Sequence, residues 1–330
     1  MHSYLVDMLS CPVCHGHLEW RILEQHGDRI ESGSARCKTC DALYPVREGI
    51  GVFLPPDQHT DDMWEQTSRQ VQYVLDRPEV EDALLHSPLE SLNPSDQFFR
   101  GRVLEARGEY AAAKEAERQA HKGLYSAASR DNQHAQFRYV IEHLPPDGPV
   151  VDLASGRCYL AEEILRATER PVVATDWDLS LLRRDRCYLE FWGLYDRASL
   201  LAFDARRTPF RDGAVTTMTS FVGLSSIREV GDLLQELRRV VSGTLLAISA
   251  FISEGDEVHA PLIRQAGMET MLFRAKALTA FEEAGWQASI ENARSSVMRP
   301  TPEGILVKGF RPDAFPVVET EQELCVIAAR

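Results

Sequence analysis

The sequence lacks any long hydrophobic run. Among its 330 residues, no stretch approaches the roughly 18 apolar residues that a membrane-spanning helix needs. Residues 1–7 have no basic region ahead of an apolar core, so no secretory signal is expected. Only seven cysteines are present, and four of them form one paired pattern that suits reduced, metal-bound thiols. We therefore expect a cytoplasmic protein with no membrane association.

Positive charge is also scarce. The 36 Lys and Arg residues face 50 Asp and Glu residues, which gives a net charge of −14 and a pI near 5.2. Such a chain gains no general electrostatic help in holding a polyphosphate, so nucleic acid would need a local basic patch. The only dense basic run is residues 183–186, which we interpret as a solvated helix face. Nucleic acid is therefore disfavoured as a partner, although it is not excluded.

The cysteines that are present are informative in their spacing. Cys11 and Cys14 form one C-x2-C pair, and Cys37 and Cys40 form a second pair after an intervening stretch that begins with a strand-like alternation at residues 18–23. Two such pairs supply the four thiolates that a tetrahedral structural zinc requires. Disulfides in a secreted domain, or four cysteines that are close only by chance, are the alternatives. The pattern favours a zinc ribbon.

The ribbon has a recognisable resemblance. Residues 5–14, 37–40 and the Tyr-Pro-Val-Arg-Glu-Gly-Ile sequence at 44–50 resemble a small zinc-ribbon family, known as an activator and partner subunit of tRNA and protein methyltransferases. The resemblance covers residues 1–56. It implies that the ribbon shields an apolar edge of a methyltransferase domain, here in cis, or that it presents a substrate. A protein partner bound through the ribbon is a further expectation.

Residues 57–130 form a polar segment that is expected to be a helical connector or lid. Pro78, Pro88 and Pro94 divide it into short helices, because proline is tolerated at a helix start but not within one. Asp131 could then cap the first helix of the next region.

The third region, residues 131–330, alternates strands and helices. The expected strands are short apolar runs, as in parallel strands buried on both faces, at residues 149–153, 171–175, 199–203, 214–219 and 244–249. Helices are expected at residues 159–166, 179–193 and 229–241. This pattern predicts the α/β fold class, with a doubly wound, Rossmann-like sheet behind the ribbon and connector.

Three strand ends carry groups that suit a nucleotide. Asp152 ends the first strand, and the small residues up to Gly156 let the backbone approach a ligand at the following helix. Asp176 ends the second strand, where a carboxylate can accept both ribose hydroxyls. Asp204 and the small Ala205 end the third, where they suit an adenine edge.

Taken together, these features resemble the class I methyltransferases that use S-adenosylmethionine, especially the branch that includes quinone C-methylating enzymes. The stretches 203–214 and 281–286 are typical of that branch. The resemblance assigns Ala154 and Cys158, with Asp152 and Gly156, to the cofactor loop, places Trp177 beside the adenine and Phe221 near the methionine and the acceptor. It also implies that the last strand, residues 323–328, inserts antiparallel beside a strand at 287–298, with an inserted hairpin arm at 304–309.

The loop departs from the family pattern. The family usually reads G-x-G-x-G, whereas this chain has Ala154, Gly156 and Cys158. A β-carbon at the third position restricts positive φ, so a non-catalytic interaction protein with a degenerate cofactor site is the alternative function. A nicotinamide oxidoreductase is disfavoured because G-x-G-x-x-G is missing.

The sequence shows no universal catalytic residue, since methyl transfer chiefly needs an aligned acceptor. His259 and Tyr159 are possible bases, but neither is favoured over an ordinary packing role. The Asn-Pro-Pro-Tyr signature of amino-methylating nucleic-acid enzymes is absent. We expect the unidentified methyl acceptor to be a small molecule or a protein, with RNA less favoured.

Overall fold

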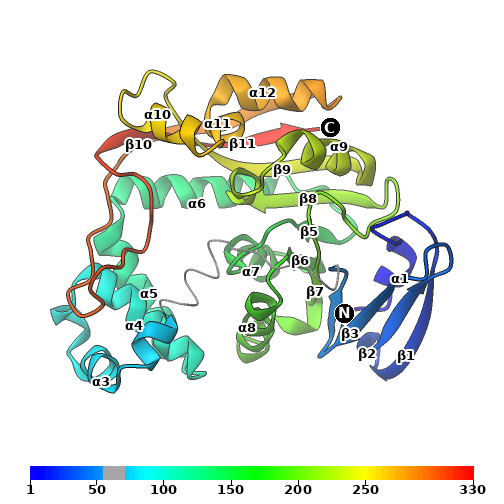
Figure 1. The fold of residues 1–330 in the computed structure, drawn as a ribbon, viewed down its shortest axis with the longest axis horizontal. Coiled ribbons are helices and arrows are strands. Elements are labelled where there is room, and N and C mark those ends of the chain that lie inside the picture. Colours follow the sequence, from blue (N-terminus) through cyan, green and yellow to red (C-terminus); the bar gives the residue numbers. More distant parts are fainter. Residues whose placement is uncertain (55–70) are drawn as a thin grey trace.

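A single mixed sheet organises the computed structural model, which describes residues 1–54 and 71–330 (Figure 1). Its eleven described strands lie in the order β1-β2-β3-β4-β7-β6-β5-β8-β9-β11-β10. The strands are β1 (Leu18–His26), β2 (Arg29–Cys37), β3 (Leu43–Arg47), β4 (Ile50–Val52), β5 (Val150–Asp152), β6 (Val172–Asp176), β7 (Ala198–Ala202), β8 (Val215–Phe221), β9 (Val241–Ile252), β10 (Ala288–Met298) and β11 (Thr320–Ala329).

The central strands confirm the predicted fold class. Strands β7, β6, β5, β8 and β9 are parallel, and β11 pairs antiparallel with both β9 and β10. Each expected strand of this region is present, and β9 extends beyond the predicted residues 244–249 at both ends, because it pairs with β8 from Val241 and with β11 as far as Ile252. The antiparallel last strand distinguishes this sheet from that of a dinucleotide dehydrogenase.

Helices cover both faces of the sheet, as the apolar runs predicted. On one face lie α6 (Ala127–Glu142), α7 (Tyr159–Ala167) and α8 (Leu179–Phe191), and on the other lie α9 (Val230–Val240) and α12 (Arg274–Glu283) (Figure 1). Neighbouring residues of a strand point to opposite faces, so Val150 packs toward α7 and Val151 toward α9. Among the described residues, no helix is both long and apolar enough to cross a membrane.

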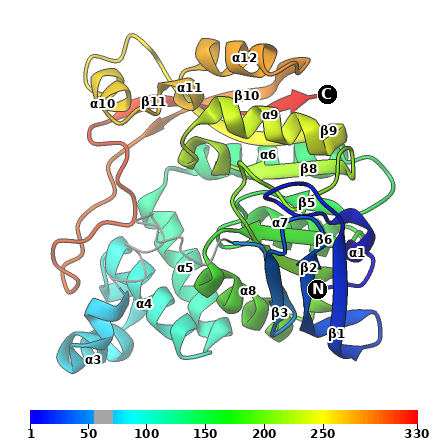
Figure 2. The ribbon, with the colours of Figure 1, turned by 45° about the vertical axis from the view of Figure 1, so that its right-hand side comes forward.

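The ribbon extends this sheet in cis. Its four strands pair in antiparallel order, and β4 then runs parallel to β7, with Ile50 opposite Leu200 and Val52 opposite Ala202. The amide of Phe53 donates to the carbonyl of Ala202 at 2.7 Å. Figure 2 shows β1 to β3 beside the edge of the parallel strands. The β7 edge, which would otherwise expose unpaired backbone groups, is therefore covered by the ribbon.

Side chains reinforce this junction. Arg29 of β2 is almost fully buried, and its Nη2 donates to the carbonyl oxygens of Tyr195 at 2.5 Å and Ala198 at 3.0 Å. A second contact joins Leu9, after α1 (Leu5–Met8), to Phe210 through an isolated β-bridge. The ribbon core also belongs to the same apolar cluster as the face under α9.

The missing side chain of Gly51 in β4 leaves room for the side chains of Leu201 and Met1. A β-carbon at this position would lie 2.7 Å from Cδ2 of Leu201 and 3.0 Å from Sδ of Met1. We expect Gly51→Val to lower the free energy of unfolding by about 1–3 kcal/mol through overpacking, measured by urea denaturation. The control is Gly231→Ala at an exposed site with no heavy atom within 4 Å, which should leave stability equal or slightly higher. Equal stability of the two variants would contradict this role for Gly51.

The connector is helical where it is described. It contains α3 (Pro78–His86), a 3₁₀ turn (Leu89–Ser91), α4 (Pro94–Ala106) and α5 (Tyr110–Leu124). Pro78 and Pro94 each occupy the first turn of a helix, as predicted. The part of the predicted connector at residues 55–70 lies outside the described residues. Helix α6 begins at Ala127, where Ser126 accepts from the amide of Ser129, so the prediction that Asp131 caps this helix is wrong.

The predicted hairpin arm is a loop instead. Residues 304–309 form no strands, and they lie in the long connection between β10 and β11 that reaches α3 and α4 (Figure 1). The carboxylate of Asp96 on α4 accepts from the amides of Ile305, Leu306 and Val307 at 2.9 to 3.2 Å. These bonds replace the strand ladder that a hairpin would need, because they satisfy the same backbone donors.

Candidate functional site

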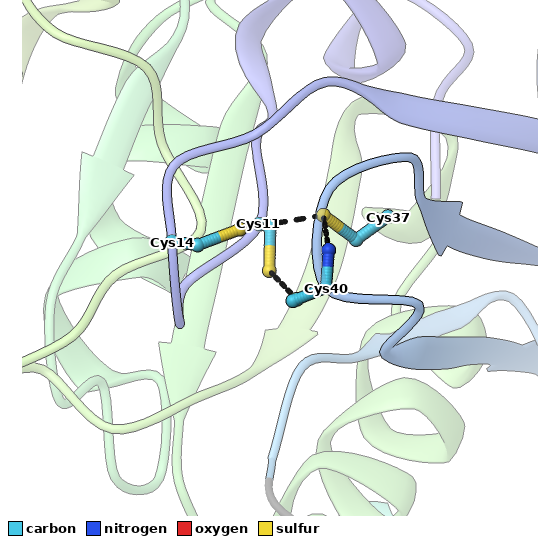
Figure 3. A group of neighbouring side chains, drawn as sticks. All are labelled: Cys11, Cys14, Cys37 and Cys40. Atoms are coloured by element: carbon cyan, nitrogen blue, oxygen red, sulfur yellow. Dashed lines mark hydrogen bonds between the residues drawn. The ribbon is translucent and has the colours of Figure 1, made fainter.

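Two groups of residues carry chemistry, and the first is the cysteine cluster (Figure 3). Cys11 and Cys14 precede β1, whereas Cys37 ends β2 and Cys40 lies in the turn before β3. The Sγ atoms of Cys11 and Cys40 are 3.6 Å apart, those of Cys14 and Cys37 are 3.4 Å apart, and all four lie within 4.8 Å of one another. Four sulfurs at about 2.3 Å from one tetrahedral zinc would be separated by roughly 3.8 Å. The cluster therefore fits a structural zinc.

Hydrogen-bond donors surround the sulfurs of the cluster. The amides of Thr39 and Cys40 point at Sγ of Cys37 at 3.4 and 3.5 Å, and the hydroxyl of Tyr44 lies 3.2 Å from Sγ of Cys11. Donors placed around thiolates stabilise their negative charge and orient them. The Tyr44 ring in turn stacks on Phe53 with centroids 5.3 Å apart, which links the cluster to the junction with β7.

The second group lies at the carboxyl ends of β5 and β6. These neighbouring parallel strands are in register, with Asp152 opposite Ala174, and this brings Asp152, the following loop and Asp176 to one edge. In such sheets ligands bind outside the carboxyl ends of the strands, where the strand order reverses. The structure thus brings together the residues predicted for the loop and for the ribose.

Asp152 is fully buried. Its Oδ1 accepts from the hydroxyl of Thr219 at 2.7 Å, whereas its Oδ2 is buried with no hydrogen-bond partner among the described residues. Burial raises the pKa of this carboxyl to about 7, and the nearby charge of Asp176 adds to the effect. An unpaired buried acceptor is costly, so this oxygen marks a place where a ligand donor would be favourable.

Asp176 is nearly as buried and is partly satisfied by its own loop. It accepts from the amide of Gly156 at 3.1 Å and from that of Asp178 at 3.1 Å. Burial raises its pKa to about 7 as well. With these two bonds made, the carboxylate keeps further lone pairs, so it fits a ribose diol.

The loop itself contains three left-handed residues. The φ angles are 49° at Ala154, 55° at Gly156 and 58° at Cys158. A non-glycine residue in this conformation stores about 1–3 kcal/mol of strain and persists where its surroundings determine it. The thiol of Cys158 is fully buried in the core under α7 and α8, and burial raises its pKa far above the usual range.

The methyl group of Ala154, which a glycine would lack, is accommodated by the absence of a side chain at Gly223. Gly223 lies against it, and a β-carbon built on Gly223 would come within 2.7 Å of Cβ of Ala154. A glycine missing from the loop is therefore matched by a glycine after β8.

The predicted adenine contacts are less open. Asp204 accepts from the backbone amide of Arg206 at 2.9 Å and from its guanidinium at 3.0 and 2.7 Å, and Arg206 also pairs with Glu229. Ala205 is half-buried against the core. An adenine amine at Asp204 would therefore share or replace the Arg206 contact, and this assignment stays a prediction.

Trp177 and Phe221 are half-buried at the ends of β6 and β8. The Phe221 ring packs edge-to-face on Phe137 of α6, with centroids 4.9 Å apart. Their proposed contacts with the cofactor also stay predictions.

Both possible bases, His259 and Tyr159, are already hydrogen-bonded to other residues. Nδ1 of His259 lies 2.9 Å from Oδ2 of Asp256, and its Nε2 accepts from the amide of Val317 at 3.1 Å. Both ring nitrogens are therefore occupied by hydrogen bonds within the protein. The hydroxyl of Tyr159 donates to Glu117.

Sequence reasoning missed a buried ionic cluster beside the loop. The interpretation of residues 183–186 as a solvated face is wrong for Arg184, because its guanidinium lies 2.5 Å from the buried carboxylate of Asp185 and 3.7 Å from Glu105 of α4. The cluster also contains Arg157, between Gly156 and Cys158, and Arg102 of α4. The alternation of opposite charges on a helix was the available signal, but it did not say which helix would cover it.

Comparisons with known proteins agree with this arrangement. Residues 2–49 match the family described as Trm112p-like protein, within the predicted ribbon. A UPF0434 protein of Dechloromonas aromatica (strain RCB) is 35% identical over 54 residues, which cover 16% of this chain and 79% of that protein. A UPF0434 protein of Stutzerimonas stutzeri (strain A1501) is 33% identical over 69 residues, 21% of this chain and all of that protein. The resemblance of the ribbon is thus confirmed.

Solved structures resemble part of the chain in fold. A putative methyltransferase from Bacillus halodurans C-125 aligns with a TM-score of 0.46 at 18% identity, over 61% of this chain and 98% of that one. Geranyl diphosphate C-methyltransferase from Streptomyces coelicolor A3(2) aligns with a TM-score of 0.46 at 17% identity, over 65% of this chain and 80% of that one.

Proposed function

Through its zinc ribbon the chain belongs to the Trm112p-like family of UPF0434 proteins, and we propose that the whole chain is an S-adenosylmethionine-dependent methyltransferase with this ribbon fused in cis. The observation that carries the proposal is the meeting of Asp152, Asp176 and a loop of left-handed residues at the carboxyl ends of β5 and β6. The antiparallel β11 beside β9 supports it, since it separates this sheet from that of a dehydrogenase.

Each group has a defined part in this proposal. The carboxylate of Asp176 holds the ribose hydroxyls, and the buried Oδ2 of Asp152 accepts from a donor of the same ligand. The cofactor supplies an electrophilic methyl group, so the protein mainly has to bind and align the acceptor. Phe221 and Phe137 form an apolar wall at the end of β8, next to the loop. In the ribbon, the four cysteines hold one structural Zn²⁺.

The acceptor is proposed to be a small molecule or a protein. The acidic balance of the chain, −14, disfavours RNA, because phosphate contacts dominate affinity for nucleic acids. A protein partner would meet the ribbon at its exposed apolar side chains, which include Val13, Leu23 and Leu43.

Methyl transfer from tritiated S-adenosylmethionine into fractionated cell extract tests the activity. We expect label in the small-molecule or protein fraction with the purified, zinc-loaded chain. Label confined to RNA would overturn the acceptor class, and no transfer into any fraction would count against the activity.

One observation favours a second candidate, a non-catalytic interaction protein with a degenerate cofactor site. The Asp204 carboxylate is paired with Arg206 at both oxygens, where an adenine contact was expected. If this pair closes the site, the native protein has no measurable affinity for S-adenosylhomocysteine, and Arg206→Ala gains affinity because it frees the Asp204 carboxylate. An active site requires affinity in both the native protein and the variant.

A further inference from the structure

A buried ionic cluster joins the connector to the cofactor loop. Its six charged side chains comprise three arginines and three acids, with exposed fractions between 2% and 23%: Arg102, Glu105, Glu117, Arg157, Arg184 and Asp185. They come from α4, α5, the loop and α8, which these ion pairs bring together. Buried charges are retained only where they are closely paired, so the position of each partner matters.

Within the cluster, Glu105 holds the loop directly. Nη2 of Arg157 donates to both carboxylate oxygens of Glu105, at 3.0 and 2.8 Å. Nε of Arg157 also lies 3.2 Å from the hydroxyl of Tyr159. Arg102 then ties Glu105 to Glu117, with contacts of 3.3 and 2.6 Å. The single long side chain of the loop is thus fixed by a residue that lies far upstream in the sequence.

The fixed residue stands between two left-handed ones. Gly156 tolerates this conformation, but Cys158 carries a β-carbon and adopts φ 58° and ψ 24° at the start of α7. Among the residues that the structure describes, no side chain caps that helix start. Such a conformation persists only when surrounding contacts determine it. The amide of Gly156, next to Arg157, is also the one that donates to Asp176.

We propose that Glu105 is a positioning residue for the cofactor loop, and that its bonds to Arg157 offset the strain that Cys158 introduces where the family has glycine. The connector then sets the geometry of the ribose-binding carboxylate through Arg157, Gly156 and Asp176. This inference rests on the proposed cofactor site. A merely structural cluster would dock the connector equally well whatever residue stood at position 158.

Four proteins test this difference by calorimetric titration with S-adenosylhomocysteine: the native chain, Glu105→Gln, Cys158→Gly and the double variant. We expect Glu105→Gln alone to weaken binding by about tenfold or more, and by less than about threefold when Cys158→Gly is also present. The matched control is Glu115→Gln, since Glu115 pairs with Arg118 on the exposed side of α5, and it should change affinity by less than about twofold. Equal losses in the two backgrounds would overturn the proposal.

A second readout needs no cofactor. Amide hydrogen exchange at residues 154–159 should accelerate in Glu105→Gln and return toward the native rate when Cys158→Gly is added. If the native chain binds no S-adenosylhomocysteine yet shows this pattern, the proposed function fails and the loop coupling stands. Unchanged exchange in Glu105→Gln overturns the coupling even if the cofactor binds.

Should Glu105→Gln not fold, Arg157→Lys replaces it in the same four-protein scheme. Lysine keeps the positive charge in the cluster, but its single nitrogen cannot replace the two separate donors by which Arg157 contacts Glu105 through Nη2 and the Tyr159 hydroxyl through Nε. The same coupling with Cys158→Gly is expected, and its absence overturns the proposal.

Discussion

Removing zinc from the protein is expected to lower the midpoint of thermal unfolding by more than about 10 °C, because metal binding is folding energy in so small a domain. The ribbon has little core of its own, since Leu9 and Phe53 belong to a cluster that continues into Phe203 and Phe210 of the adjoining domain. Unfolding of the ribbon would expose both this apolar surface and the backbone of β7. Metal content and thermal melts before and after chelation measure the effect.

Two variants make the zinc prediction specific. Cys14→Ser removes one of the four sulfurs and should reproduce the chelated protein, with its lower midpoint and no bound metal. Cys187→Ser alters an exposed cysteine outside the cluster and should change neither quantity. An unchanged melt and circular dichroism spectrum after complete metal removal would show that the ribbon folds without zinc.

The replacement Asp176→Asn is expected to weaken binding of S-adenosylhomocysteine by about 100-fold, since charge-assisted hydrogen bonds to two ribose hydroxyls are lost. The amide keeps the shape of the side chain, so the fold should survive. The control is Glu163→Gln on α7, which removes an exposed carboxylate from a helix next to the loop. Affinity of Asp176→Asn equal to that of this control would remove Asp176 from the site.

The same carboxyl predicts a pH dependence. Burial raises the pKa of Asp176 in the free protein to about 7, so the ionised form that accepts from the ribose is lost as the pH falls through that value. Affinity should be full above about pH 7 and decline by up to about tenfold per unit below it. Asp152 also titrates near 7 and interacts with Asp176, so the apparent pKa belongs to the pair. The decline should be shallower in Asp176→Asn, and an equal decline would contradict the assignment.

Local patterns in the sequence were enough to predict the zinc cluster, the ends of the central strands and the starts of two connector helices. The zinc cluster could be predicted because its ligands come in two tight pairs, each set by a short turn. The positions of Asp152 and Asp176 could be predicted because parallel strands bring their carboxyl ends to one edge. The connector helices began at Pro78 and Pro94 because proline fits the first helical turn.

Long-range contacts explain what could not be predicted. The partner of Arg157 is Glu105, and nothing local indicates that α4 would cover the loop. Arg184 was predicted to be solvated, because its neighbours in the sequence do not indicate that α4 packs against it. Residues 304–309 contain the glycines of a hairpin, yet their amides bind Asp96 instead of a strand. Among these unpredicted contacts, the pairing of Asp204 with Arg206 is the one that the local sequence could have indicated, because the two residues are two positions apart.

In the proposed function, the carboxyl ends of β5 and β6 hold one adenosyl group. A crystal structure of the zinc-loaded protein with S-adenosylhomocysteine tests it most directly. We predict that the ribose hydroxyls lie on Asp176, with the ligand across the loop from Ala154 to Cys158. A ligand bound elsewhere, or crystals soaked at millimolar concentration in which the Asp152 and Asp176 edge holds no ligand, would contradict it.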